Sequence, residues 1–484
     1  MGIKGMNFIG GRWTPARSGA TFERYNPANS DDLVGTFPSS DEDDVSAAVD
    51  GLVSGFAEWS CTAPEARAAT LEAAADLLAD RAESLVAELI REEGKTAAEA
   101  RMEVGRTPMN LRFYAGEAVR STGNTYPAPG QGLVYTVREP FGVIGAITPW
   151  NFPLNIPSRK IGPALAAGNT VLFKPSELTP LMGQRLVEAL LDAGLPANAI
   201  ALVHGDGKAG AAVVADERVT AVTFTGSTEV GRRIHREVGP ARRVQLEMGG
   251  KNPVVVLDDA DLDKAAALIV KGAFGLSGQA CTGTSRVIAA AAIHDELVRK
   301  VVALAEALTV GAGTAAGVAM GPLASQDQLA KFMHYVEVGK DEGAQLVSGG
   351  ERLQHDEYSR GFFARPAVFT DTARDMRIVT EEVFGPLLAF QRAQSFDDAV
   401  ELANATSFGL SASIVTGNLA RATMFADRSR TGLVKINQPT TGMAMNAPFG
   451  GYKDSSTQTF KEQAGPTLMQ FYQSEKTIYL NPAL

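Results

Sequence analysis

Cysteine is scarce in this chain, since Cys61 and Cys281 are the only two among 484 residues. So few cysteines in so long a chain exclude a disulfide scaffold, and they fit a reducing compartment such as the cytoplasm. Histidine is scarce as well, and none of the five forms a metal-ligand pair with a cysteine or another histidine in the sequence. We therefore expect a cytoplasmic protein without a metal site.

The chain also lacks long apolar runs and basic blocks. No apolar run approaches the ~18 residues that span a bilayer, and the N-terminus lacks the apolar core of a secretory signal. Lys and Arg number 45 against 55 Asp and Glu, which gives a net charge of −10. We expect neither a membrane nor nucleic acid as a partner. An anionic small-molecule substrate would need a local arginine or lysine, because the net charge offers it no attraction.

The pattern of apolar residues predicts an α/β protein of two or three domains. In the first third, Ser40 can cap a helix through 44–59, and 63–95 is typical of one or two amphipathic helices. From Gly142 onward, short apolar runs alternate with helical stretches, and a second region of this kind covers 253–453. This alternation predicts parallel sheets with helices on their faces.

Two segments far apart in the sequence, 132–140 and 467–480, have strand character but few neighbouring strands to pair with. Unpaired strand edges tend to be covered, either within the chain or by another subunit. We expect these two strands to form a small sheet that joins subunits.

Two predicted turns contain residues suited to a nucleotide. In Phe224–Gly231 (FTGSTEVG), Gly226 permits close backbone approach and the helix that follows favours an anion at its N-terminus, although the spacing is not GxGxxG. In Phe173–Glu177 (FKPSE), Lys174 and Glu177 can reach ribose hydroxyls at the carboxyl edge of a sheet. Taken singly, an ordinary turn and a surface ion pair explain these motifs more simply.

Cys281 is the candidate nucleophile, because Gly278 and Gly283 let the backbone pack tightly around its thiol. The alternative is a small buried hydrophobic residue, which is the commoner role of a lone cysteine. Cys61 has no such glycines, and we assign it no chemistry.

Two further residues could assist a nucleophile. Glu247 ends a predicted strand and can act as a general base, or it can simply pair with Lys251. Asn151 lies in a loop stiffened by prolines, so it can donate to an oxyanion or merely form a turn. Each structural alternative is the simpler one for that residue alone.

The motifs together favour the catalytic interpretation. PWNFP, FKPSE, FTGSTEVG, LEMGGKNP, GQACT, EEVFGP and APFGGYK follow one another along the chain. This order, and the separation of Glu247 from Cys281, resembles the aldehyde dehydrogenase superfamily over nearly the whole chain. The resemblance implies a homodimer or homotetramer whose subunit has three parts. These are a Rossmann-like cofactor-binding domain (1–119 and 141–249), an α/β catalytic domain (250–453) and an oligomerisation sheet (120–140 and 466–484).

The resemblance also assigns roles to single residues. Cys281 matches the family nucleophile, Glu247 the general base, Asn151 the oxyanion residue and Lys160 a lysine of the catalytic site. The residues that match cofactor contacts are Thr148, Pro149, Trp150, Lys174, Ser176, Glu177, Gly207, Gly226, Ser227, Met248, Glu382 and Phe384. The residues that match substrate contacts are Arg159, Phe152, Gln279, Thr282 and Phe449.

The implied mechanism begins with attack of the Cys281 thiolate on the aldehyde carbonyl. The oxyanion is held by the Asn151 amide and the backbone N–H of Cys281. Loss of hydride to the nicotinamide leaves a thioester, which is hydrolysed by a water molecule that Glu247 deprotonates.

Arg159 bears on the choice of aldehyde, because many general aldehyde dehydrogenases have an aromatic residue there. An arginine at this place resembles the succinate-semialdehyde dehydrogenase branch, where it grips the substrate carboxylate. A structural ion pair is the alternative, and Gly275 stands where that branch has its second carboxylate-binding arginine. Other segments resemble 2-oxoglutarate-semialdehyde (2,5-dioxopentanoate) dehydrogenases, which is the interpretation we prefer. An extra residue after Lys453 leaves open whether Glu462 relays a proton to Lys160.

NAD is the expected cofactor, because the Glu177 carboxylate would repel a 2′-phosphate. Ser176 can donate to that phosphate, so NADP stays open.

Other classes of protein share part of the site. A broad-specificity aldehyde dehydrogenase would share all of it, a CoA-acylating dehydrogenase would not need Glu247, and a cofactor-free thiol esterase would need only Cys281, Asn151 and Glu247. An enzyme-like structural protein would need none.

Overall fold

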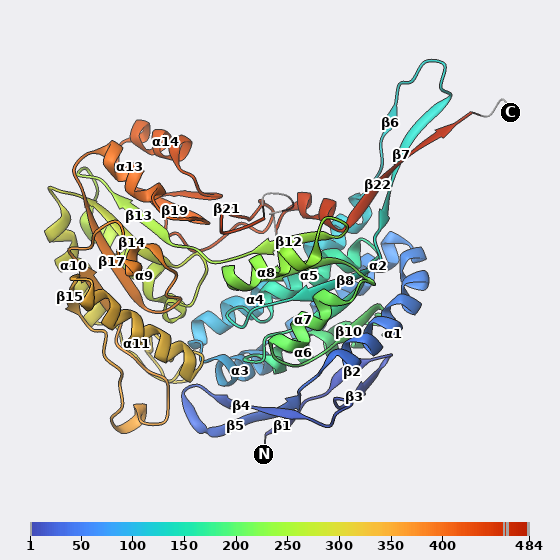
Figure 1. The fold of residues 1–484 in the computed structure, drawn as a ribbon, viewed down its shortest axis with the longest axis horizontal. Helices are drawn as coiled ribbons and strands as arrows, with labels where there is room; N and C mark the ends of the chain where they lie inside the picture. The colour runs from blue at the N-terminus through green and yellow to red at the C-terminus, as the bar shows by residue number, and fades with distance from the viewer. Residues whose placement is uncertain (1, 458–459, 461–463, 482–484) are drawn as a thin grey trace.

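The computed structural model describes residues 2–457, 460 and 464–481. In this part of the chain, two seven-stranded sheets lie side by side with helices packed on them, and a narrow three-stranded arm projects from one side (Figure 1). The first sheet is built from the N-terminal half and the second from residues after 250. The site described below lies where the two meet.

The first sheet has the strand order β12-β11-β8-β9-β10-β2-β3. Strands β12, β11, β8, β9 and β10 are parallel, and β2 and β3 add an antiparallel edge. The register aligns Ile147 with Lys174 and Thr225 with Glu247, so the loops that follow these four residues leave the same edge. The bounds are β2 Asn7–Ile9, β3 Arg12–Thr14, β8 Val143–Ile147, β9 Thr170–Lys174, β10 Ile200–Leu202, β11 Val219–Thr225 and β12 Arg243–Glu247.

The second sheet has the order β15-β16-β17-β14-β13-β19-β20, and only β15 runs antiparallel to its neighbour. Valines and isoleucines fill its central strands, as expected for strands buried on both faces. The bounds are β13 Asn252–Val256, β14 Thr284–Ala290, β15 Gln345–Ser348, β16 Ala367–Thr370, β17 Leu387–Ala393, β19 Ser411–Val415 and β20 Leu433–Ile436. The α/β arrangement predicted from the sequence is therefore present in both halves.

The projecting arm joins the two orphan strands predicted from the sequence. β22 (Gln473–Leu480) pairs antiparallel with β7 (Leu133–Pro140) along its whole length, and β6 (Thr125–Tyr126) extends the sheet (Figure 1). The expected pairing is thus confirmed, while its role in joining subunits stays a prediction. The remaining strands form two small sheets. One contains β1 Ile3–Lys4, β4 Thr21–Asn26 and β5 Asn29–Pro38, and the other contains β18 Phe408–Gly409 and β21 Tyr452–Lys453.

The N-terminal helices follow the predicted pattern with one correction. The first helix begins at Glu42 and is capped by Asp41, whose side chain accepts from the backbone N–H groups of Asp43 and Asp44, so the prediction that Ser40 is the cap is wrong. Ser40 instead accepts a hydrogen bond from Asn7. The helices of the first half are α1 Glu42–Cys61, α2 Pro64–Asp80, α3 Ala82–Glu93, α4 Ala97–Arg120, α5 Asn155–Ala166, α6 Pro180–Asp192, α7 Gly207–Ala215 and α8 Thr228–Val238. Those of the second half are α9 Leu262–Phe274, α10 His294–Glu306, α11 Gln326–Asp341, α12 Arg377–Thr380, α13 Phe396–Asn404 and α14 Leu419–Arg428.

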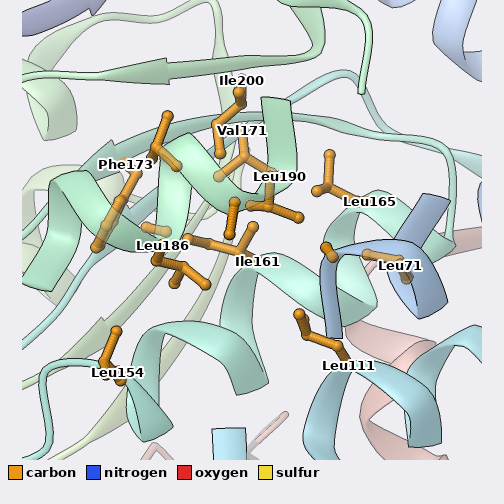
Figure 2. Close-up of a cluster of buried hydrophobic side chains, with 14 of the residues drawn as sticks. Leu71, Leu111, Leu154, Ile161, Leu165, Val171, Phe173, Leu186, Leu190 and Ile200 are labelled. Atoms are coloured by element: carbon orange, nitrogen blue, oxygen red, sulfur yellow. The ribbon is translucent and has the colours of Figure 1, made fainter. Parts of the chain in front are cut away.

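Helix α5 lies at the centre of the first core, and all twelve of its residues are buried. Figure 2 shows its Ile161 and Leu165 among apolar side chains of α2, α4, α6 and strand β9. Such enclosure fixes the helix firmly, because a well-packed interior tolerates little movement. Arg159 and Lys160 therefore project from a rigid element, and the burial of two charged side chains on one helix points to a specific use.

Candidate active site

A cavity of about 150 Å³ lies between the carboxyl edge of the first sheet and the loop that precedes β14. We call it the thiol cavity, because Cys281 lines it. It brings together nine of the residues that the sequence singled out: Pro149, Trp150, Asn151, Gly226, Ser227, Met248, Cys281, Glu382 and Phe384. These nine come from segments spread over more than two hundred residues. Six of them follow strands β8, β11 and β12, which end at one edge of the first sheet, and Cys281, Glu382 and Phe384 come from loops that precede β14 and β17 of the second sheet.

The Cys281 thiol is partly buried and faces two carboxylates. Burial, followed by the charges of Glu382 and Glu247, raises its pKa to about 12, and the Arg159 guanidinium opposes this shift. At neutral pH the thiol is therefore protonated in the protein alone. A reactive thiolate requires proton removal or a new positive charge in this cavity.

The loop around Cys281 is held in place by hydrogen bonds to its backbone carbonyl groups. Asn252 Nδ2 donates to the carbonyl oxygens of Cys281 and Gly283 at 2.8 and 2.9 Å. Gly278 has φ +70°, and a Cβ there would lie 2.3 Å from a backbone oxygen of Gly385. The glycine noted in the sequence is thus required by both conformation and close packing.

Gln279 serves this loop as well. Its side-chain oxygen accepts from the Ala324 backbone N–H at 3.0 Å, and its Nε2 donates to the Leu276 carbonyl oxygen at 3.3 Å. Both ends of a buried amide are therefore engaged by backbone. The Gln279 side chain therefore holds the loop, and a contact between Gln279 and substrate stays a prediction.

Asn151 lies beside the thiol and is almost fully buried. Its Nδ2 donates to the Gln279 carbonyl oxygen at 2.9 Å, so the amide is already turned toward the cysteine loop. Its backbone carbonyl accepts from Lys95, a buried lysine that pairs with Glu93 and Glu103 at 3.4 and 3.1 Å. This ionic group fixes the position of the Asn151 amide, which an oxyanion donor needs.

Glu103 fixes the start of helix α5 too. One of its carboxylate oxygens accepts from the backbone N–H groups of Leu154 and Asn155 at 2.9 and 3.1 Å. It thereby takes the place of a capping side chain, which Leu154 cannot supply. Neither Lys95 nor Glu103 was singled out from the sequence, where they are two charges among many in the first third of the chain. Their burial and partners identify them only in the fold.

Glu247 ends β12 and is buried. Its carboxylate accepts a hydrogen bond from Ser456 Oγ at 2.8 Å. The alternative role suggested by the sequence, an ion pair with Lys251, is not observed: the Lys251 Nζ is buried without a hydrogen-bond partner among the described residues, and burial lowers its pKa to about 7. Glu247 and Cys281 are close enough for the carboxylate to act on the thiol pKa.

The Lys160 side chain extends from α5 to strands β11 and β12 of the first sheet. Its Nζ donates to Thr223 Oγ1 at 2.8 Å and to Gln245 Oε1 at 3.2 Å. Burial lowers its pKa to about 7, and the nearby charge of Glu247 opposes that shift. Lys160 is therefore a group that can hold or release a proton near neutral pH. Glu462, its candidate relay partner, lies outside the described residues.

Lys174 ends β9, Glu177 follows it, and the two form an ion pair of 3.4 Å. The lysine is buried, whereas the Glu177 side chain is 47% exposed. Ser176 is buried beside them, and Thr148 Oγ1 is buried without a hydrogen-bond partner among the described residues. A buried cation next to an open carboxylate at a strand end is an arrangement that suits a ribose. Gly207 begins α7 after the next strand and does not line the thiol cavity.

The turn after β11 begins helix α8 with little room for side chains. A Cβ at Gly226 would lie 2.4 Å from the Phe224 ring, and one at Gly231 would lie 2.4 Å from the Met248 sulfur. Ser227 caps the helix through the Val230 backbone N–H. The backbone thus comes close to the cavity while the helix N-terminus faces it, as the sequence motif predicted.

Glu382 and Phe384 close the cavity from the second half. Glu382 accepts from the Gly250 backbone N–H at 3.0 Å, and a Cβ at Gly249 would lie 2.1 Å from its carboxylate. Burial raises the pKa of Glu382. Phe384 has φ +56° and packs edge-on against Trp150, with ring centroids 5.4 Å apart. These residues form a wall around the space in front of the thiol.

A second cavity of about 250 Å³, which we call the arginine cavity, lies between α4, α5 and the loop at Met443. Arg159 lines it and contacts the Met443 sulfur, and its guanidinium lies 5.9 Å from the centre of the Phe449 ring. Phe449 and Met443 also pack near Cys281. Burial lowers the Arg159 pKa, and among the described residues no carboxylate pairs with it.

The remaining predicted contacts lie around these two cavities. Phe152 packs against Lys95, whose Nζ is 4.8 Å from the ring centre. Thr282 is buried next to Cys281, and its carbonyl oxygen accepts from Thr440 at 2.7 Å.

Within the described ranges, no three His, Cys, Asp or Glu side chains are grouped as a metal site would be. No described helix is long and apolar enough to cross a membrane.

A nucleophile with an adjacent carboxylate, an oxyanion amide and a strand-edge cofactor site are the parts of a thiol-dependent dehydrogenase. The aldehyde dehydrogenase family model matches residues 13–478, and the chain belongs to this family. Alpha-ketoglutaric semialdehyde dehydrogenase of Bacillus subtilis is 41% identical over 99% of this chain and 98% of its own. The 2,5-dioxopentanoate dehydrogenase of Saccharolobus solfataricus is 40% identical over 99% of both chains.

A solved structure supports the same conclusion. The NAD+ complex of an aldehyde dehydrogenase from Bacillus cereus has a TM-score of 0.94 and 36% identity, over 99% of this chain and 96% of that one. Family and fold together confirm the α/β fold class, the aldehyde dehydrogenase activity and the nicotinamide dependence predicted from the sequence.

Proposed function

We propose that this chain oxidises a carboxylated semialdehyde, with 2,5-dioxopentanoate as the preferred substrate, and that NAD accepts the hydride. The observation that carries the choice of substrate is Arg159. Its buried guanidinium lines a cavity behind the thiol, and among the described residues it has no carboxylate partner. A buried charge without a counter-ion is costly, so a substrate carboxylate is a natural partner. The names of the two relatives support the same class.

The residues at the sheet edge fit the cofactor. Lys174 and Glu177 suit the ribose hydroxyls, the turn at Gly226 and Ser227 suits the pyrophosphate, and Glu382 suits the second ribose. When bound, the nicotinamide supplies the hydride acceptor. We propose that the carboxylates of Glu382 and Glu247 lie near the positive charge of the nicotinamide ring.

In the first half-reaction, the Cys281 thiol gives its proton to solvent water, and the thiolate adds to the aldehyde carbon, so that the C=O double bond opens and its oxygen becomes an oxyanion. Asn151 Nδ2 and the Cys281 backbone N–H donate to this oxygen, each worth roughly 3–4 kcal/mol in comparable sites. Loss of hydride from the former aldehyde carbon leaves a thioester on Cys281. The group Lys95–Glu93–Glu103 keeps the Asn151 amide in place.

In the second half-reaction, Glu247 takes a proton from water, and the hydroxide adds to the thioester carbon. The carbon–sulfur bond then breaks, which releases the carboxylate product and restores the Cys281 thiolate. The proton held by Glu247 must leave before the next cycle. Lys160 is suited to that exchange, because the charge of Glu247 acts on it and its pKa of about 7 lets it change charge near neutral pH.

A succinate semialdehyde dehydrogenase is the second candidate, since Arg159 would serve that shorter substrate equally. The other sequence-based assignments stay proposals: the three-part division (1–119 with 141–249, 250–453, and 120–140 with 466–484), a homodimer or homotetramer joined through the arm, and a cytoplasmic location. The division follows the three main sheets.

The test of this proposal is a panel of aldehydes assayed for reduced-nicotinamide formation with NAD and with NADP. The panel contains 2,5-dioxopentanoate, succinate semialdehyde, and uncharged aldehydes of four and five carbons. We expect the highest kcat/KM for 2,5-dioxopentanoate with NAD. Equal kcat/KM for charged and uncharged aldehydes would refute the choice of substrate, and activity only in the presence of CoA would indicate the acylating class.

A further inference from the structure

The arginine cavity contains a second guanidinium that the sequence did not single out. Arg106 on α4 lines it together with Arg159 on α5. Arg106 and Asn110 lie one turn apart on α4, as do Asn155 and Arg159 on α5, so each helix presents one arginine and one amide to the same space. The cavity is thus polar and positively charged on two sides.

Arg106 differs from the other exposed arginines of its helix. Arg101 pairs with Glu83, Arg112 with Asp76 and Arg120 with Glu117. Among the described residues no carboxylate lies within ion-pair distance of Arg106, and its charge acts unfavourably on Arg159. Two like charges facing one cavity repel each other, and an anion placed between them would relieve that repulsion.

The two arginines occupy different depths. Arg159 is buried on a rigid helix near the thiol, whereas Arg106 is exposed and donates to the Met443 carbonyl oxygen at 3.5 Å. Arg106 is therefore at the solvent end of the cavity. A charge at the rim of a site chiefly speeds the arrival of a charged ligand, which matters in a chain of net charge −10.

We infer that Arg106 is a specificity-determining residue that binds the substrate carboxylate from the solvent side while Arg159 binds it from the interior. This inference rests on the proposed function, because it presumes a carboxylated substrate. Asn155 adds a polar contact, since its Oδ1 accepts from Asn110 Nδ2 at 2.8 Å and its Nδ2 is left as the donor for the cavity.

The experiment compares Arg106→Gln, Arg106→Lys and the matched control Arg101→Gln, which removes one positive charge from the same helix outside the cavity. KM and kcat are measured for succinate semialdehyde and for butanal at low and moderate salt. Arg106→Gln should raise KM for the charged aldehyde by about three- to tenfold and weaken its salt dependence, with kcat nearly constant. Butanal should lose much less, and Arg106→Lys should recover part of the loss.

The outcomes separate this inference from the proposed function. If the wild-type enzyme prefers the charged aldehyde but Arg106→Gln leaves its KM unchanged, Arg106 has no part in specificity while the proposed function stands. An equal loss with Arg101→Gln would also overturn the inference, because the effect would then be one of general charge. If the wild-type enzyme does not prefer the charged aldehyde, both proposals fail.

Discussion

The thiol cavity and the arginine cavity differ in the charged side chains that line them. The thiol cavity is lined by Glu382 and Lys331, and the Glu247 carboxylate acts on its thiol, whereas the arginine cavity is lined by Arg106 and Arg159 and, among the described residues, by no carboxylate. The first suits a cationic nicotinamide ring and the second an anionic aldehyde. The net charge of −10 describes neither, because only the local groups act on a bound ligand.

The difference also explains the state of the nucleophile. Cys281 lies between a region that raises its pKa and one that lowers it, and the carboxylates together with burial prevail. The thiol is therefore held neutral until a positive charge enters the thiol cavity. Predictions that alter one side at a time test whether the two cavities have separate roles.

The largest effect is expected from replacing Cys281. Cys281→Ala removes the group that both cavities serve, so aldehyde oxidation should fall to trace levels while folding and cofactor binding persist. Cys61→Ala is the control, because Cys61 is exposed. Turnover with each nicotinamide cofactor, together with a thermal unfolding curve, checks both variants. Substantial turnover by the Cys281 variant would show that the nucleophile is another group.

Glu247→Gln acts on the thiol cavity and keeps the side-chain shape. Loss of the base should slow thioester hydrolysis by about 10²- to 10⁴-fold, which is the usual contribution of general base catalysis. Stopped-flow measurement should show a burst of reduced cofactor close to one per site, followed by slow turnover. If the burst disappears as well, Glu247 is needed before the thioester forms, and our division of the two half-reactions is wrong.

The sequence predicted much of the thiol cavity and little of what supports it. Cys281, Asn151 and Glu382 belong to short motifs whose order resembles a family, and the structure brings these motifs to one cavity between the two large sheets. Lys95, in the turn between α3 and α4, and Arg106, on α4, belong to no such motif, and a charge in such a helical region is normally solvated. Only packing distinguishes the buried Lys95 from the exposed Arg101, or the unpaired Arg106 from the paired Arg112.

Removal of Arg159 acts on the arginine cavity. A charged hydrogen bond contributes roughly 1.5–3 kcal/mol, so Arg159→Ala should lower kcat/KM for a carboxylated aldehyde by about ten- to a hundredfold. For an uncharged aldehyde, kcat/KM should fall much less, because only the effect of the arginine on the thiol pKa is lost. The comparison of both substrates in wild type and variant decides the matter. An equal fall for both would make Arg159 a structural residue.

Glu382→Gln tests the charge of the thiol cavity without any substrate. After burial, Glu382 is the largest cause of the raised Cys281 pKa, so its neutralisation should lower that pKa. Alkylation of the cofactor-free enzyme by iodoacetamide should then be faster at a given pH, by up to about tenfold for one pKa unit. In the wild type, with the thiol pKa at about 12, the rate should rise continuously between pH 7 and 10. A plateau near pH 8 would contradict the raised pKa.

The smallest effect is expected at the outer end of the cofactor site. Glu177 carries a carboxylate where a 2′-phosphate would lie, so we expect NAD to be used at least as well as NADP. The side chain is 47% exposed, and solvent screens its charge. Glu177→Gln should therefore shift the ratio of kcat/KM for NAD and NADP toward NADP by only about two- to fivefold. Glu217→Gln, an exposed carboxylate on another loop, is the control and should not change the ratio. A strong wild-type preference for NADP would make Ser176 the dominant determinant. The effect should also be confined to the cofactor, because Glu177 borders neither the thiol cavity nor the arginine cavity.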